Sequence, residues 1–149
     1  MTRELCHELY KHWTNDASIY MDIHLFQPYV YDEAAVNRYF DMKRQDASRR
    51  LFAIMLGDKV IGELQLKQID HDKKECSLSI HMQNDAVKGR GYGTQAERLA
   101  VKTAFDELGM AAVNADTIRK NTRSQHVLRK VGFRFVGQDE TFKYYRIEQ

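Results

Sequence analysis

The stretch that most constrains this chain runs from Val87 to Ala96 and reads Val-Lys-Gly-Arg-Gly-Tyr-Gly-Thr-Gln-Ala. Three of the chain's eight glycines alternate there, at positions 89, 91 and 93, beside the cations Lys88 and Arg90. Glycine lets the backbone turn with positive φ and approach a ligand closely. A helix that begins after such a loop directs its unpaired N–H groups and its positive dipole end at the same place. The stretch therefore predicts an anion site, and phosphate is the usual anion.

The residues before the loop change from a helical to a strand-like period. Helices are predicted over 3–14, after the cap Thr2, and over 33–45, after the cap Asp32. Between them lies an irregular aromatic segment from Tyr20 to Tyr31. Strands are predicted over 51–56, 60–69 and 75–82, and the short turns that join them make them antiparallel.

After the loop the chain alternates between helices and strands. A helix is predicted over 94–108, then a strand over 111–117, a helix over 122–131 and a hairpin over 133–136 and 141–147. The expected apolar face of the first of these helices consists of Ala96, Leu99, Ala100, Thr103, Ala104 and Leu108. The order predicts an α+β fold with one mixed, mainly antiparallel sheet and helices on its faces.

Composition excludes several other classes of protein. A net charge of +2 over 149 residues, without a clustered basic face, gives no indication of nucleic-acid binding. No apolar run approaches the roughly 20 residues of a membrane span, and no signal-peptide pattern opens the chain. Cys6 and Cys76 have neither metal nor disulfide spacing. We therefore expect a cytoplasmic protein without metal, nucleic-acid or membrane partners.

Two common phosphate motifs do not fit the loop. A Walker loop ends in Gly-Lys-Ser/Thr, which this loop lacks. The pattern Gly91-x-Gly93-x-x-Ala96 matches a dinucleotide fingerprint, with Asp116 downstream. That fingerprint should follow its strand directly, but residues 83–87 intervene, and too little chain follows for a doubly wound sheet. We reject both motifs.

Two segments together resemble the GNAT N-acetyltransferases. Lys88-Gly89-Arg90-Gly91-Tyr92-Gly93-Thr94 resembles the acyl-CoA-binding motif Arg/Gln-x-x-Gly-x-Gly/Ala of that family, with Lys88 in the Arg/Gln position. Asn121–Phe133 is similar to its second signature, Asn-x-x-Ser/Ala followed by a helix that ends Lys-x-Gly-Phe. The resemblance covers roughly 51–147 and is strongest to the branch with ribosomal-protein-alanine, aminoglycoside and spermidine acetyltransferases. It implies one acyl-CoA N-acyltransferase domain over residues 1–149, with acetyl-CoA as cosubstrate.

The resemblance also implies where acetyl-CoA binds. The backbone N–H groups of residues 89–94 would hold the pyrophosphate, and Lys88 and Arg90 would add positive charge. The strand at 80–82 would splay from the strand at 111–117, and pantetheine would pair with the exposed backbone in that gap. Asn121 would bond the CoA arm and Ser124 would cap the helix or contact the arm. The implied binding residues are Ile80, His81, Met82, Lys88, Gly89, Arg90, Gly91, Tyr92, Gly93, Thr94, Asn121 and Ser124.

Acyl transfer to an amine needs a group that accepts the amine proton, because a free lysine-type amine titrates near pH 10.4. Glu75 at the start of its strand, His81 on the same face and Glu63 on the neighbouring strand are the alternatives. Many members of the family carry a tyrosine that protonates the sulfur seven positions after the motif asparagine, but here that residue is Leu128. Ser124, Tyr144 or Tyr145 would replace it, or the thiolate leaves unaided. The two cysteines are expected to be structural, since no covalent nucleophile is needed.

A second departure from the family concerns the sheet edge. The family usually opens with a strand before its first helix, whereas this chain enters the helix almost at once. The sheet would then lack its first edge strand, through truncation, a late start, or replacement by a partner chain, and the last of these allows a homodimer. The acceptor would be a protein N-terminus, a polyamine or an aminoglycoside. The alternative of a different class is a non-catalytic acyl-CoA-binding module, which the missing tyrosine permits.

Overall fold

The computed structural model describes residues 1–19 and 23–149, so residues 20–22, where the predicted aromatic segment begins, lie outside the described residues. The first helix, α1 (Arg3–Lys11), ends three residues earlier than predicted, and its cap is Thr2, whose hydroxyl accepts from the N–H of Leu5. Two short turns follow, η1 (Ala17–Ile19) and η2 (Ile23–Leu25). The second helix, α2 (Glu33–Gln45), has the predicted bounds and cap, because the Asp32 carboxylate accepts from two backbone N–H groups of its first turn.

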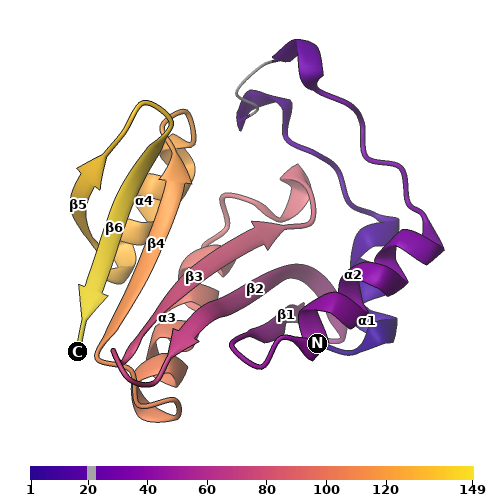
Figure 1. Cartoon of the computed structure of the whole chain (residues 1–149). Helices are drawn as coiled ribbons and strands as arrows, with labels where there is room; N and C mark the ends of the chain where they lie inside the picture. Colours follow the sequence, from indigo (N-terminus) through magenta and orange to yellow (C-terminus); the bar gives the residue numbers. More distant parts are fainter. Residues whose placement is uncertain (20–22) are drawn as a thin grey trace.

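One six-stranded sheet forms the centre of the molecule, in the order β1-β2-β3-β4-β6-β5 (Figure 1). Its strands are β1 (Arg50–Leu56), β2 (Lys59–Asp70), β3 (Glu75–Met82), β4 (Ala112–Ile118), β5 (Arg134–Gln138) and β6 (Phe142–Glu148). All neighbours are antiparallel except β3 and β4. The predicted mixed, mainly antiparallel sheet is confirmed, and the strand ends agree with the prediction to within two residues.

The parallel pair β3–β4 holds together over only part of its length. Its register starts at Glu75 opposite Ala112 and ends at Ser77 opposite Asn114. Beyond Ser77, β3 stays paired with β2 as far as Met82, opposite Gly62. Figure 1 shows the two strands diverging from their shared start. The predicted splay of the 80–82 segment from β4 is therefore confirmed, and it leaves one side of β3 without a partner strand.

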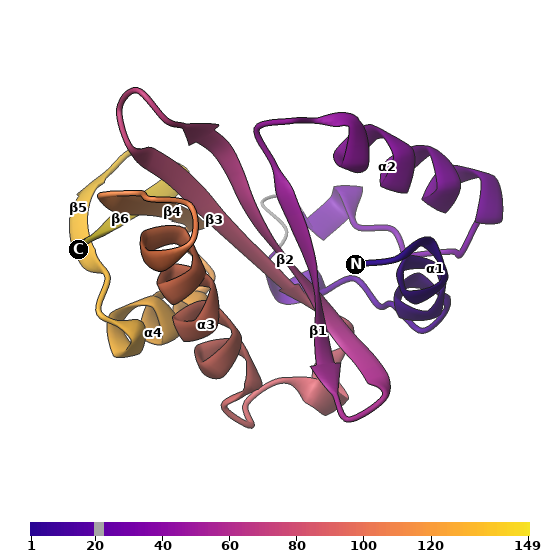
Figure 2. The same ribbon diagram turned by 90° about the horizontal axis from the view of Figure 1, so that it is seen from below.

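Helices cover both faces of the sheet (Figure 2). On one face lie α3 (Tyr92–Asp106) and α4 (Thr122–Val131), and on the other lie α1 and α2, over β2 and β1. The main core lies beneath α3 and α4 and includes Leu64, Leu66, Leu78, Val113 and Phe133. No helix in the described part of the chain is long and apolar enough to cross a membrane.

The apolar face of α3 differs from the prediction. Leu99, assigned to that face, is 66% exposed, whereas Glu97 is only 1% exposed. The buried positions of α3 are Glu97, Ala100, Val101 and Ala104. The helix also begins two residues earlier than predicted, after Gly91, which takes the left-handed conformation at its N-cap.

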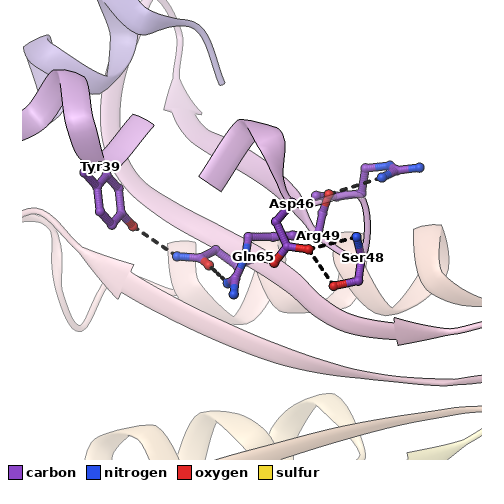
Figure 3. Close-up of polar contacts among 6 residues, drawn as sticks. Tyr39, Asp46, Ser48, Arg49 and Gln65 are labelled. Atoms are coloured by element: carbon purple, nitrogen blue, oxygen red, sulfur yellow. Dashed lines mark hydrogen bonds and ion pairs between the residues drawn. The ribbon is translucent and has the colours of Figure 1, made fainter. Parts of the chain in front are cut away.

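The edge of the sheet beside α2 is formed by β1, and among the described residues no strand precedes α1. Polar contacts hold the end of α2 against β2 near this edge (Figure 3). The Gln65 amide donates to the Tyr39 hydroxyl at 3.1 Å and accepts from the Arg49 guanidinium. The Asp46 carboxylate accepts from Arg49 and from Ser48. These bonds fix Tyr39 over the polar face of β2.

Candidate active site

The glycine loop forms the cap of α3. Gly89 and Gly91 have φ values of 72° and 83°, which a residue with a Cβ adopts only with strain. Gly91 supplies no side-chain cap, and the first bond into the helix runs from the N–H of Gln95 to the carbonyl of Gly91. The N–H groups of residues 92–94 therefore have no acceptor within the helix. Unpaired N–H groups at a helix start are the feature on which the sequence-based prediction of an anion site depends.

The two loop cations have different surroundings. The Lys88 ammonium lies 3.3 Å from an Asp16 carboxylate oxygen and 3.2 Å from one of Asp85, and its side chain is largely buried. Arg90 is exposed and has no ion pair within the described part of the chain. Lys88 thus ties the loop to the segment after α1, while Arg90 remains directed at solvent.

Two cavities open beside this loop, at the place where β3 and β4 diverge. Both are lined by Ile19, Ile80, His81, Glu97, Asn121 and Ser124. One extends to Lys88 and Gly93 at the start of α3, and the other extends to Leu128 and to β4. Met82 lines the first as well. The structure therefore brings together most of the residues that the resemblance assigned to CoA.

Asn121 and Ser124 lie at the start of α4. The Asn121 side-chain oxygen accepts from the N–H of Ser124 at 3.1 Å, so Asn121 is the helix cap. Gln125 is buried and donates to the carbonyls of Ile118 and Arg119, which fixes α4 to the end of β4. Both predicted residues thus have a structural role and still face the cavities.

His81 lies on the face of β3 that is directed at α1. Its ring centroid is 6.4 Å from that of Trp13, and across the strands it pairs in register with Glu63. The residue is exposed, but the surrounding protein lowers the pKa of the imidazole by desolvation, while Glu63 partly opposes that shift. The imidazole is therefore neutral at neutral pH and can accept a proton.

Glu63 is a buried carboxylate that two tyrosines bind. The hydroxyls of Tyr10 from α1 and Tyr39 from α2 donate to it at 2.7 Å and 2.8 Å. Burial raises the pKa of both tyrosines, and Glu63 adds to the shift, so both remain hydrogen-bond donors. Tyr10 also lies 4.9 Å from Trp13 and 5.8 Å from Tyr29, measured between ring centroids. This side of the sheet presents aromatic rings around a fixed carboxylate.

The structure does not bring Glu75 and Tyr144 to the cavities. Glu75 begins β3, six residues from His81 and thus about 20 Å along the strand. Its carboxylate lies 2.6 Å from the Arg146 guanidinium, whose hydrogen bond holds the pKa of Glu75 below its usual value and makes it a weak base. The Tyr144 hydroxyl donates to Asp139 in the terminal hairpin. Neither residue lines either cavity.

Glu97 is a site residue that the sequence analysis did not find. It lines both cavities from α3, and its Oε2 has no hydrogen-bond partner among the described residues. Burial alone raises the pKa of its carboxyl to about 8, so it is mostly protonated at neutral pH. The helical period indicates that Glu97 lies on the buried face of α3, because Glu97 precedes the buried Ala100, Val101 and Ala104 by three, four and seven positions.

Both cysteines are buried thiols. Burial raises the pKa of Cys6 to about 12 and that of Cys76 to about 11, which leaves almost no thiolate at neutral pH. Within residues 1–19 and 23–149, no three His, Cys, Asp or Glu side chains gather as metal ligands would. Neither cysteine lines either of the two cavities.

Comparison with known proteins places these features in a family. The acetyltransferase (GNAT) domain family matches residues 1–134. The chain is 34% identical over 76 residues to the probable N-acetyltransferase YjcK of Bacillus subtilis, and the aligned residues cover 51% of this chain and 42% of YjcK. It is 25% identical over 99 residues to spermidine N(1)-acetyltransferase of Escherichia coli K12, and the aligned residues cover 66% of this chain and 53% of that protein. The matches thus span about half the length of these relatives.

A solved structure agrees with this assignment at the level of the fold. The N-acetyltransferase PseH of Campylobacter jejuni, in complex with acetyl coenzyme A, matches with a TM-score of 0.69 and 21% identity, over 78% of this chain and 79% of that one. The splayed strands, the glycine loop at the start of α3 and the family match over most of the chain lead to one conclusion. The chain belongs to the GNAT acetyltransferase domain family.

Proposed function

We propose that residues 1–149 bind acetyl-CoA and transfer its acetyl group directly to a primary amine. The observation that carries the proposal is the gap between β3 and β4, which leads from the free N–H groups of α3 to the neutral imidazole of His81. The pyrophosphate would lie on the N–H groups of residues 92–94, next to Arg90. Pantetheine would lie in the gap, against the unpaired side of β3 and beside Asn121 and Ser124.

The acceptor amine would approach from the α1 side of the sheet. Trp13 and His81 line the cavity there, and Glu63 lies beside His81 in the register of β2 and β3. Aromatic faces and a carboxylate attract a cationic amine before it loses its proton. We therefore infer a small polyamine as acceptor, a choice that the match to a spermidine acetyltransferase supports. A protein N-terminus and an aminoglycoside are the other members of the test panel.

His81 would accept the proton of the attacking amine, directly or through water. The amine nitrogen bonds to the acetyl carbon, and the bond from that carbon to the CoA sulfur then breaks. Backbone N–H groups of β3 that face the gap would stabilise the oxyanion that develops in between. No covalent intermediate on the protein is required, in agreement with the buried, protonated cysteines.

Replacing His81 with asparagine should lower kcat about 100-fold, because general-base catalysis typically contributes that much or more. Desolvation by the surrounding protein lowers the pKa of His81, so wild-type kcat at saturating amine should hold at pH 7 and fall only below the ordinary histidine pKa of 6.5. In His81→Asn that acidic decline should disappear. His71→Asn, in the exposed turn before β3, is the matched control. Unchanged kcat and an unchanged acidic decline in His81→Asn would exclude His81 as the base.

Leu128 favours a second candidate, a non-catalytic acyl-CoA-binding module. The residue is 2% exposed and aliphatic, so it donates no proton to a sulfur. Measuring CoA release over the amine panel, together with the melting temperature in acetyl-CoA, separates the two. Transfer predicts both a higher melting temperature and CoA release with at least one amine. A higher melting temperature without release from any amine supports the binding module, and no change in either measurement excludes both.

We also infer that two copies of the chain associate along β1. This strand has a partner on one side only, and it exposes Met55 and Leu56. An unpaired edge with apolar side chains favours pairing with another chain. Light scattering should give twice the chain mass, and replacing both residues with lysine should give the monomer mass. A monomeric wild-type protein would contradict the inference.

A further inference from the structure

The buried carboxyl of Glu97 is the strongest unexplained polar group in the described molecule. Protein interiors seldom contain an unpaired carboxyl, because burying a polar group without a hydrogen bond costs free energy. Glu97 is 1% exposed, its Oε2 has no partner among the described residues, and it lies in the wall shared by both cavities. The only other buried side-chain atom without a partner there is the Tyr145 hydroxyl, which lines neither cavity.

The surroundings of Glu97 keep its proton in place. The charged and titratable side chains that line the same two cavities are Asp16, Lys67, His81, Lys88, Asp116 and Arg123. None of them contributes to the raised pKa of Glu97, which comes from burial alone. No cation among them stabilises the ionised form of Glu97. Glu97 therefore lines the cavities as a neutral carboxylic acid and can donate a hydrogen bond.

Glu97 lies close to the position where Leu128 replaces the expected proton donor. Leu128 stands in the place where the resemblance implies a tyrosine proton donor, and it lines one cavity together with Glu97. Glu97 lies on α3, about one helical turn after Gly93, so it follows the anion-binding end into the gap between β3 and β4. A carboxylic acid thus occupies the same cavity wall as the aliphatic side chain.

We propose that Glu97 is the proton donor to the CoA thiolate that leaves during acetyl transfer. As the bond between the acetyl carbon and sulfur breaks, the sulfur keeps the electron pair and takes the proton of the Glu97 carboxyl. The products are the amide and CoA thiol, the amine proton goes to His81, and the Glu97 carboxylate regains a proton from solvent after CoA leaves. An alkyl thiol such as cysteine titrates near pH 8.5, close to Glu97, so the transfer is nearly balanced. This inference rests on the proposed acetyl transfer.

The test is Glu97→Gln, which keeps the size and a hydrogen-bond donor but has no acidic proton. We expect kcat to fall about 100-fold, the magnitude of general-acid catalysis, with little change in the Kd for CoA. Wild-type kcat should also decline above about pH 8, and this decline should be absent in the variant. Glu107→Gln, an exposed glutamate after the same helix, is the control and should match the wild type in every measurement.

A second measurement does not require activity. Infrared spectroscopy of the free wild-type protein at pH 7 should show a protonated carboxyl band that Glu97→Gln lacks. The proposal is overturned if Glu97→Gln keeps the wild-type kcat, whether or not its Kd for CoA rises. It is also overturned if Glu97 is ionised at pH 7 in the wild-type protein. Wild-type protein that binds acetyl-CoA but acetylates no amine, with the infrared band present, would instead refute the proposed transfer, and the donor role with it.

Discussion

Replacing Glu97 with leucine should stabilise the protein by about 3 kcal/mol at pH 7. The pKa of Glu97 is about 8 in the folded chain, and its ordinary value is 4.5. At pH 7 the unfolded chain therefore has an ionised Glu97, and folding must protonate it, which costs free energy. Each pKa unit corresponds to about 1.4 kcal/mol, and roughly 2.5 units separate 4.5 from pH 7. For a chain of this length the melting temperature should rise by about 10 °C.

The sign of the pH dependence follows from proton linkage. Because the folded pKa is raised, the wild-type fold binds the extra proton between pH 4.5 and about 8 and loses stability as pH rises through that window. The gain in Glu97→Leu should therefore be smallest below pH 4.5, grow to about pH 8 and then level off. Thermal unfolding at several pH values measures it, with Glu107→Gln as the control. A gain that does not depend on pH, or a less stable variant, would contradict a buried neutral carboxyl.

A destabilising buried carboxyl agrees with the proposed role of Glu97. A carboxyl that lowers stability in the wild-type fold is the pattern of a functional group, since activity and stability often oppose each other at a site. Glu97→Leu should thus be more stable and less active. A variant that gains stability and keeps wild-type kcat would indicate that Glu97 has no part in the chemistry.

Replacing Gly91 with alanine should raise the Kd for acetyl-CoA about tenfold. Gly91 has a φ of 83°, a conformation that costs a residue with a Cβ about 1–2 kcal/mol. A shift away from it turns the N–H groups of residues 92–94 from the site, and the new methyl group points into space that the folded chain leaves open. Each tenfold change in Kd corresponds to about 1.4 kcal/mol. Isothermal titration with acetyl-CoA measures the change.

The control for Gly91→Ala is Gly109→Ala. Gly109 has a φ of 69° and equally open surroundings, but it follows the far end of α3. The two variants should lose similar stability, and only Gly91→Ala should lose affinity. Wild-type affinity in Gly91→Ala, or an equal loss in both variants, would show that the start of α3 does not hold the donor.

Local sequence signals predicted much of the fold. The Asp32 cap, the strand over 75–82 and the helix over 122–131 each depend on a few neighbouring residues, and the structure agrees with each of these predictions. The splay of β3 from β4 was implied by the family resemblance alone, since nothing in either strand shows where their pairing ends. Short-range chemistry therefore predicts the ends of individual elements, whereas the end of the β3–β4 pairing required the resemblance.

The parts that depend on distant contacts could not be read from the sequence. Glu75 was a candidate base because it shares a face with His81, but its ion pair with Arg146 joins residues 71 positions apart. Glu63 meets Tyr10 and Tyr39 only because α1 and α2 pack over β2. The predicted apolar face of α3 includes Leu99 and omits Glu97, whereas the packing of α3 buries Glu97 and exposes Leu99.

Acetyl transfer is tested most directly by incubating the protein with acetyl-CoA and spermidine and quantifying both products by mass spectrometry. Direct transfer predicts acetylated amine and free CoA in equal amounts, with much less of both from His81→Asn and Glu97→Gln. If acetyl-CoA binds but spermidine and the other amines of the panel remain unmodified, the chain is not an acetyltransferase for these amines and the proposed function is wrong.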